Sequence, residues 1–370
     1  MMRTCCTLLL LLALSAAAGG CGDEYTNAVF DEDTAFLAAV PLARELALSA
    51  PWWEGGAVAV GHGSGLAGRQ QALGEGDGDH DGEDGRGLDE GAAIGEAAPT
   101  SELYRNTRGL TLGLDQGVFW LLRPLDEVIA EPPALRLPDR RIWGPCRHPL
   151  DPAESRLVVQ RQGEGVYGYV LEQRLVVQGP GATTGQQGFA AVLSGEFSPE
   201  AAGVRRGAGA ITFDLDQAAR FALTPGRGLV HAEYEKRRWQ LALRLWLQRF
   251  SVSPEEAPLD AALDLLRYAD GSGDLEWAAR DEQGQLILLR SRWLPDGSGR
   301  GDLQLLAGAG GEPLYQVSEC WGTSFAQVYR RVGLGQVTYE ESGSVQECSP
   351  ALRAAAWTER VQPPPLGEEE

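Results

Sequence analysis

The chain has 370 residues, of which 43% are hydrophobic and ten are tryptophan, so it can bury a core over most of its length. Its 52 Asp and Glu residues outnumber its 32 Lys and Arg residues and give a formal net charge of −20. This balance excludes nucleic acid and anionic lipid headgroups as expected partners, because both require clusters of Lys and Arg.

Residues 1–20 are typical of an export signal and not of a folded domain. Arg3 precedes an apolar run over residues 8–14, and small residues follow up to Cys21. The run is too short to span a bilayer. The Ala18-Gly19-Gly20-Cys21 segment resembles a bacterial lipobox, although Ala18 stands where a large aliphatic residue is usual. This resemblance implies cleavage before Cys21 and acylation of its thiol with chains such as palmitate.

An acylated Cys21 implies a lipid-anchored protein of the cell envelope. Each buried methylene contributes about 0.8 kcal/mol, and stable anchoring takes more than one chain. Gly22 follows the cysteine and resembles an outer-membrane address, so the outer membrane is favoured over the inner membrane. The alternative is a secreted protein that an ordinary signal peptidase cuts.

Residues 21–54 form the first segment of the mature chain and carry a helical pattern over 22–50, which Pro41 is expected to kink or divide. Residues 55–99 are rich in Gly, Asp and Glu and predict a disordered linker. Its Gly-x-Gly-x-x-Gly pattern at 63–68 lacks a βαβ unit for dinucleotide binding. Asp77, Asp79 and Asp81 match half of a calcium loop, but position twelve falls on Leu88, so a solvated acidic spacer is preferred over a weak calcium site.

Residues 100–348 are predicted to form the globular body. Apolar residues at helical spacing predict a helix over 114–130, which Pro132-Pro133 would end. From 156 onward the period changes to two, most clearly over 239–248. Further strands are expected at 156–161, 166–177, 188–194, 210–215, 228–234, 275–280, 286–293, 303–306, 314–321 and 325–332, while 259–268 fits a helix or a strand.

These strands predict a mainly β fold, an antiparallel meander that forms a barrel or a strongly curved sheet with the N-terminal helix packed on or in it. Asp-Gly-Ser-Gly occurs at 270–273 and again at 296–299. The two copies indicate either a duplicated hairpin or turn chemistry alone. Residues 349–370 are expected to form a short helix over 351–361 and a disordered tail.

Three cysteines remain in the body once Cys21 serves as the anchor. Cys320 and Cys348 flank a predicted terminal hairpin, so a disulfide between them is preferred in an oxidising compartment. Cys146 would then be an odd free thiol, although its pairing with either partner stays open.

No pattern of residues predicts an enzyme or a cofactor. The segment at 322–326 is the nearest approach to a nucleophile elbow, so a hydrolase is the alternative, but it lies in a predicted hairpin. The four histidines that could serve a triad are His62, His80, His148 and His231. Cys146 and His148 form the one candidate soft metal pair, too few ligands for zinc.

Trp143-Gly144-Pro145 lies between the apolar helix and the first expected strand and is interpreted as architecture, with the tryptophan closing one end of a barrel. Together with the export cysteine, the acidic spacer and the Glu319-Cys320-Trp321 segment, it resembles uncharacterised lipoproteins of myxobacterial type. That resemblance implies no activity.

The expected function is that of a non-enzymatic envelope lipoprotein that binds a lipid or another hydrophobic small molecule inside its β domain. The candidate lining residues are Tyr167, Tyr169, Trp239, Leu241, Leu243 and Leu245. The alternative is a structural or protein-binding surface lipoprotein, in which these residues are plain core and an envelope protein is the partner.

Overall fold

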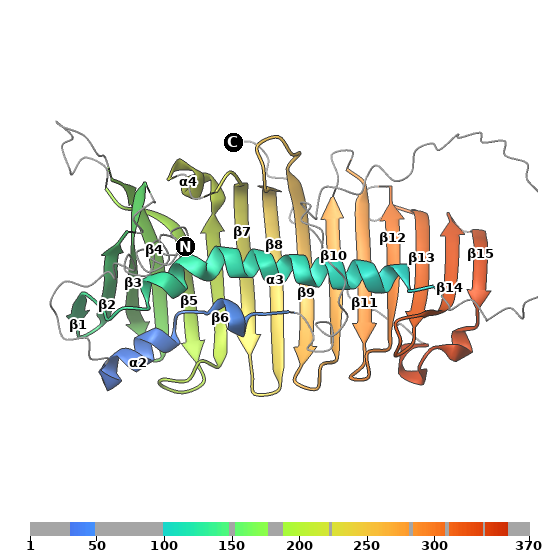
Figure 1. The fold of residues 1–370 in the computed structure, drawn as a ribbon, viewed down its shortest axis with the longest axis horizontal. Coiled ribbons are helices and arrows are strands. Elements are labelled where there is room, and N and C mark those ends of the chain that lie inside the picture. Colours follow the sequence, from blue (N-terminus) through green and yellow to red (C-terminus); the bar gives the residue numbers. More distant parts are fainter. Residues whose placement is uncertain are drawn as a thin grey trace, which may run out of the picture.

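One meander of antiparallel strands forms the body of the protein. The structure is a computed structural model, and it describes residues 30–48, 99–147, 152–176, 188–221, 224–280, 284–307, 311–335 and 337–353. In this part of the chain fifteen strands make one sheet in sequence order (Figure 1). They are β1 (Leu135–Leu137), β2 (Arg140–Cys146), β3 (Ala153–Gly163), β4 (Val166–Leu175), β5 (Ala190–Pro199), β6 (Gly207–Asp214), β7 (Arg227–Lys236), β8 (Gln240–Ser251), β9 (Leu259–Tyr268), β10 (Gly273–Arg280), β11 (Leu286–Trp293), β12 (Gly299–Leu306), β13 (Pro313–Trp321), β14 (Gln327–Leu334) and β15 (Val337–Gly343).

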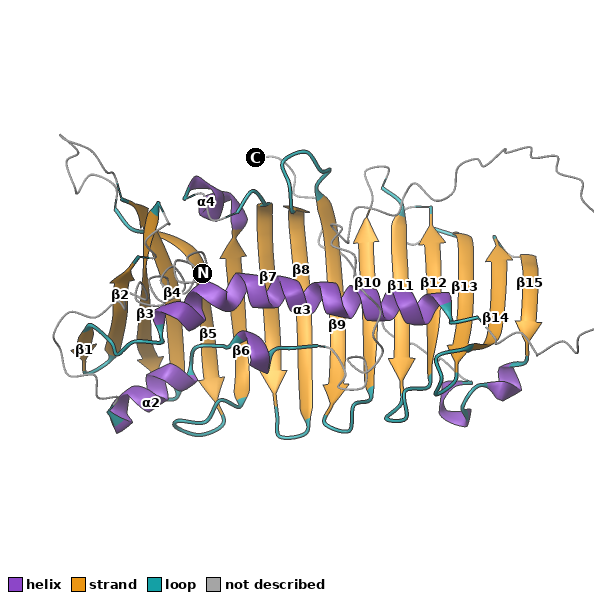
Figure 2. Cartoon of the chain, viewed as in Figure 1, coloured by secondary structure: helices purple, strands orange, loops and turns teal. Residues whose placement is uncertain are grey.

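The mainly β antiparallel fold is therefore confirmed, whereas the sheet does not close into a barrel. β1 and β15 lie at opposite ends of the sheet, and among the described strands each pairs with one neighbour only. Closure would require the first and last strands to meet in register. Here a long helix covers one face across most of its width (Figure 2), so that the apolar face is buried without closure.

Short helices accompany the sheet. The N-terminal pattern gives α2 (Asp31–Ala38) and the 3-10 turn η1 (Ala43–Glu45), separated near Pro41 as expected. A further helix, α4 (Leu215–Arg220), follows β6, and the 3-10 turns η3 (Val345–Glu347) and η4 (Pro350–Leu352) follow β15. Of the helix expected over 351–361, only the beginning lies within the described residues.

The long helix, α3, spans Glu102–Val128 and thus begins well before the predicted start at Leu114. Ser101 is its N-cap and accepts a hydrogen bond from the Tyr104 N–H at 3.1 Å, a favourable start that the apolar spacing alone does not show. Glycines within the first half of the helix, such as Gly109 and Gly113, interrupt the apolar pattern, so the periodicity does not predict this half.

The two Asp-Gly-Ser-Gly segments form the same turn. The Asp270 carboxylate accepts hydrogen bonds from the Ser272 N–H at 2.9 Å and hydroxyl at 2.6 Å, and Asp296 accepts the same pair from Ser298 at the same distances. In each turn a backbone carbonyl also accepts a hydrogen bond from a tryptophan indole N–H. Trp293 Nε1 donates to Gly271 at 2.9 Å and Trp321 Nε1 to Gly297 at 3.0 Å. Because turn chemistry alone does not supply the tryptophans, we interpret β10–β11 and β12–β13 as two copies of one hairpin unit.

The first turn of α3 is fixed to the sheet by a buried carboxylate. Glu319 on β13 is fully buried and accepts hydrogen bonds from the Ser101 hydroxyl at 2.6 Å and the Leu103 N–H at 2.9 Å. Arg330 Nη1 on β14 donates to its other oxygen at 3.2 Å. The carboxylate thus satisfies free N–H groups at the positive end of the helix, where negative charge is stabilising.

Small residues of the sheet let the helix approach closely beside this contact. A Cβ on Gly301 would lie 2.8 Å from the Leu103 Cβ, too close for any larger residue without a shift of the helix. The Thr107 hydroxyl forms a hydrogen bond with that of Ser291, at 2.5 Å. We call the face of the sheet that α3 covers the helix face, and the opposite one the outer face.

At the other end of the sheet, α2 is fixed by a buried ion pair. Asp33 is fully buried, and its two oxygens accept hydrogen bonds from Arg141 Nε at 2.6 Å and Arg136 Nε at 3.0 Å. The Arg141 guanidinium also lies 4.4 Å from the centre of the Phe36 ring. Burial would raise the pKa of Asp33, but the hydrogen bonds from the two arginines outweigh it and lower the pKa below 3.8.

We expect Glu319→Gln to lower the free energy of unfolding by about 2 to 3 kcal/mol, because it removes a charged acceptor from buried N–H donors. Urea denaturation measures the loss. Glu255→Gln in the exposed β8–β9 loop is the control and should change stability by less than about 0.5 kcal/mol. Equal stability of the two variants would contradict the role given to Glu319.

The Asp33 pair predicts a dependence of stability on pH. Because the folded pKa is depressed, the contribution of the pair is fully present above 3.8 and is lost as the pH falls through the folded value. Asp33→Asn should therefore cost about 3 to 5 kcal/mol at pH 7, and the difference from the natural chain should shrink below pH 3.8. Denaturation curves at several pH values test this. A stability difference between the natural chain and Asp33→Asn that stays constant with pH would contradict the role given to this pair.

Candidate binding surfaces

The six residues proposed to line a hydrophobic site do not surround an open space together. Tyr167, Tyr169, Leu241, Leu243 and Leu245 are buried and belong to the main hydrophobic core, whereas Trp239 precedes β8 and is 60% exposed. The same core includes Leu110, Leu114, Leu122 and Leu125 of α3. The helix therefore occupies the space above the strands in which a hydrophobic ligand was expected.

Tyr169 illustrates how closely the helix face is packed. Its ring lies against Gly195 of the neighbouring strand, and its hydroxyl donates a hydrogen bond to the Ala210 carbonyl at 3.2 Å. Burial, with the nearby Tyr234 phenol, raises the pKa of Tyr169 well above its usual value, so this phenol stays neutral. It is a satisfied core residue and does not offer a free donor to a ligand.

A groove of about 690 Å³ lies over the middle of the sheet, from β5 to β11. Four of its charged residues, Glu233, Arg244, Asp264 and Glu276, are cross-strand neighbours on four successive strands. Glu276 in turn pairs with Arg290 on β11. Leu243 and Leu265, which are adjacent in sequence to Arg244 and Asp264, point to the opposite side and pack on the helix face. The groove is consequently a feature of the outer face.

Six carboxylates are among the residues that line this groove: Glu196, Glu233, Glu235, Asp264, Asp274 and Glu276. Arginines pair with several of them. Arg244 Nε lies 2.8 Å from Asp264, Arg290 lies 3.3 Å from Glu276, and Arg292 pairs with Asp274. Such cross-strand pairs add modest stability to the sheet.

The residues considered for catalysis or metal binding are dispersed. Ser324 lies in the β13–β14 turn, where its neighbour Phe325 stacks on Tyr104 at 4.4 Å between ring centres. His231 lies on β7, and its Nδ1 is 2.9 Å from the Thr212 hydroxyl. Within the described residues no three His, Cys, Asp or Glu side chains gather as a metal site.

Several proposed site residues lie outside the described residues. These are Cys21, the calcium candidates Asp77, Asp79 and Asp81, the glycine pattern at 63–68, and His62, His80 and His148. Of the linker predicted over 55–99, only Pro99 lies within them. Cys146 is described and is itself disulfide-bonded, so the expected free thiol is a wrong prediction, and its sulfur is not a thiolate ligand.

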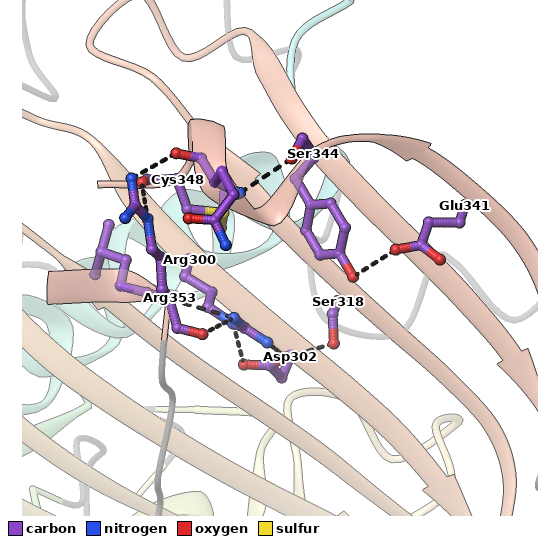
Figure 3. The surroundings of a disulfide bond; sticks show 11 residues. Arg300, Asp302, Ser318, Glu341, Ser344, Cys348 and Arg353 are labelled. Carbon is purple, nitrogen blue, oxygen red and sulfur yellow. Dashed lines mark hydrogen bonds and ion pairs between the residues drawn. A yellow bond between two sulfur atoms is a disulfide. The ribbon is translucent and has the colours of Figure 1, made fainter. Parts of the chain in front are cut away.

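The expected disulfide between Cys320 and Cys348 is present, with Cα atoms 5.7 Å apart. It ties the segment 344–353 back onto β12–β14, and arginines reinforce this return (Figure 3). Arg300 Nη1 donates to the Arg353 carbonyl at 3.1 Å, and Arg353 donates to the carbonyls of Cys348 at 3.2 Å and Gln346 at 2.6 Å. We call the disulfide and these hydrogen bonds the C-terminal clasp.

The sequence reading missed β1, β2 and β15, and with them both edges of the sheet. All seven residues of β15 are exposed, so it lacks the alternation that marks a half-buried strand. One local pattern could have predicted β15. Val337, Thr338 and Tyr339 favour strands and follow a glycine-containing turn.

No protein-family model matches the chain, and neither a curated protein nor a solved structure does. Among the described helices none combines the length and the apolar character that crossing a membrane requires.

Replacing both clasp cysteines, Cys320→Ala with Cys348→Ala, should lower the free energy of unfolding by about 3 to 4 kcal/mol. The bond closes a loop over a separation of 28 residues, and its loss frees the unfolded chain. Denaturation with and without reductant measures this. The natural chain should lose stability in reductant more than the variant does, and equal losses would contradict the assignment.

Proposed function

We propose that the chain is a non-enzymatic lipoprotein, anchored in the cell envelope through Cys21, whose sheet serves as a protein-binding or structural surface. The observation that carries this proposal is the position of α3. The helix covers the face on which a hydrophobic ligand would have to bind, and its buried leucines share one core with the strands.

The polar outer face supports the same proposal. Its groove holds six carboxylates together with Arg244 and Arg292, charged groups that a protein partner can pair with. Among the described residues, Ser324 in the β13–β14 turn and His231 on β7 are separated by several strands of the sheet, so these two do not form part of a catalytic triad.

Attachment to the membrane rests on the sequence of the first 21 residues. Their charge, apolar run and small residues fit an export leader that ends before Cys21. Phe30, the first described residue, follows this cysteine after eight others, so a tether of about 30 Å at most would separate the anchor from α2. An outer-membrane location is the favoured form of the proposal.

Mass spectrometry of the full chain, expressed in a Gram-negative host and extracted in detergent, tests both halves. We expect an N-terminal peptide that begins at a diacylglyceryl-modified Cys21, because the lipobox directs cleavage and acylation there. Native spectra of a Cys21→Ser variant should show the body without bound lipid, because α3 fills the helix face.

Different results would contradict the membrane anchor and the filled core. Cys146 is disulfide-bonded, and a chain cut before Cys21 keeps no cysteine outside the clasp except Cys21 and Cys146, so a bond between these two competes with acylation. An intact leader, an unmodified Cys21, or a Cys21–Cys146 disulfide in the mature protein would overturn the anchor. A stoichiometric lipid on the Cys21→Ser variant would overturn the filled core and would favour lipid carriage instead.

A further inference from the structure

The outer edge of β15 is unpaired among the described strands. β15 hydrogen-bonds to β14 on one side, and on its other side no described strand pairs with it. All seven of its residues are exposed. An edge of this length presents a row of backbone N–H and C=O groups that can template another strand.

Apolar side chains gather at the same end of the last strands. Val337 and Tyr339 on β15 are 69% and 74% exposed. Leu334, paired with Val337 in the register, is 50% exposed. We call these three side chains the β15 corner.

Two carboxylates lie in the middle of β15. Glu340 and Glu341 are consecutive, so the strand carries one acid on each face. Glu341 accepts a hydrogen bond from the Tyr329 hydroxyl at 3.4 Å, and the described ion pairs include neither of the two acids. Arg331, the cross-strand neighbour of Glu341 on β14, donates from its Nη2 to the Thr338 hydroxyl at 2.8 Å.

The C-terminal clasp holds the strand and keeps its edge open. After Gly343, which has a φ of 71°, the chain turns back onto the outer face and does not continue as a further strand. A Cβ at Gly343 would overlap the Val328 carbonyl, so this turn depends on glycine. A rigid, preformed edge loses little entropy when a partner binds.

Charge decides which partner fits. A second copy that paired antiparallel along the whole of β15 about a two-fold axis would place Glu340 opposite the same residue of its partner, and a shift by one residue would place Glu340 opposite Glu341. Like charges opposite one another are destabilising. The acidic stretches of this chain, at 74–92 and 368–370, have the same sign. A basic segment of a different protein meets neither repulsion.

We propose that β15 binds an extended segment of another protein by strand addition, a segment with Lys or Arg opposite Glu340 and Glu341 and with apolar residues that pack on the β15 corner. This inference rests on the proposed protein-binding function and names the surface and the chemistry of the partner. It does not depend on the lipid anchor.

The experiment uses the full mature chain with Cys21→Ser and a fluorescent peptide, Thr-Val-Lys-Lys-Val-Thr-Val, matched in length to β15. Thr-Val-Glu-Glu-Val-Thr-Val is the matched peptide. Fluorescence anisotropy measures binding, and hydrogen exchange with mass spectrometry shows which amides become protected. We expect the Lys peptide to bind and to protect β15, and the Glu peptide to bind about tenfold more weakly.

Charge reversal provides the internal control. Glu340→Lys with Glu341→Lys should exchange the two preferences, so that the Glu peptide becomes the tighter ligand. Glu255→Lys with Glu256→Lys, the same change of charge in the β8–β9 loop, should leave both affinities unchanged.

Equal binding of the two peptides, no protection of β15 amides, or no binding at all would overturn the proposal. Sedimentation velocity on the protein without peptide tests the alternative partner, which is a second copy of this chain. A dimer that forms through β15, or that is lost when Glu340 and Glu341 are reversed in charge, would assign the edge to that second copy. Because acylation is measured separately on Cys21, failure here leaves the anchor proposal intact.

Discussion

A buried carboxylate at the start of α3 is the constraint on which the rest of the structure depends. Glu319 places a negative charge where the helix has unpaired N–H groups and a positive end, and Arg330 balances the remaining charge. An unpaired buried carboxylate would be costly, so the hydrogen bonds from Ser101 and Leu103 favour the packing of α3 on the sheet at this position. The contact fixes one end of α3 and thereby its line across the strands.

This line gives the two faces of the sheet different roles. The helix face becomes the core, because leucines of α3 pack on leucines and aromatic rings from most of the strands. The outer face keeps cross-strand ion pairs such as Arg244–Asp264 and a shallow charged groove. An open sheet with one filled face needs no closure to bury its apolar residues, and it retains two edges that a barrel would have removed.

The edges differ in a way that bears on binding. β1 has three residues, which is a short template, whereas β15 has seven and is held by the β14 register and by the clasp. Its two glutamates prevent the full pairing of identical copies but also select a basic partner. Solubility and specificity would then follow from the same pair of side chains.

The sequence by itself determined the elements whose signal is local. Strict alternation over β8 predicted a half-buried strand, Pro41 predicted a divided N-terminal helix, and the placement of Cys320 and Cys348 around the last hairpin suggested their bond. The proposed export leader and the proposed acylation of Cys21 rest on the sequence alone. Each of these follows from residues that are close together in the chain.

The tertiary structure alone decided what distant residues do to one another. The early start of α3 depends on Glu319, more than two hundred residues away, and the burial of Leu243 under that helix turned a proposed ligand-lining residue into core. The open edges were invisible for the opposite reason. Whether a strand is the last of its sheet depends on the absence of a neighbour among the described strands, which no pattern within the strand records.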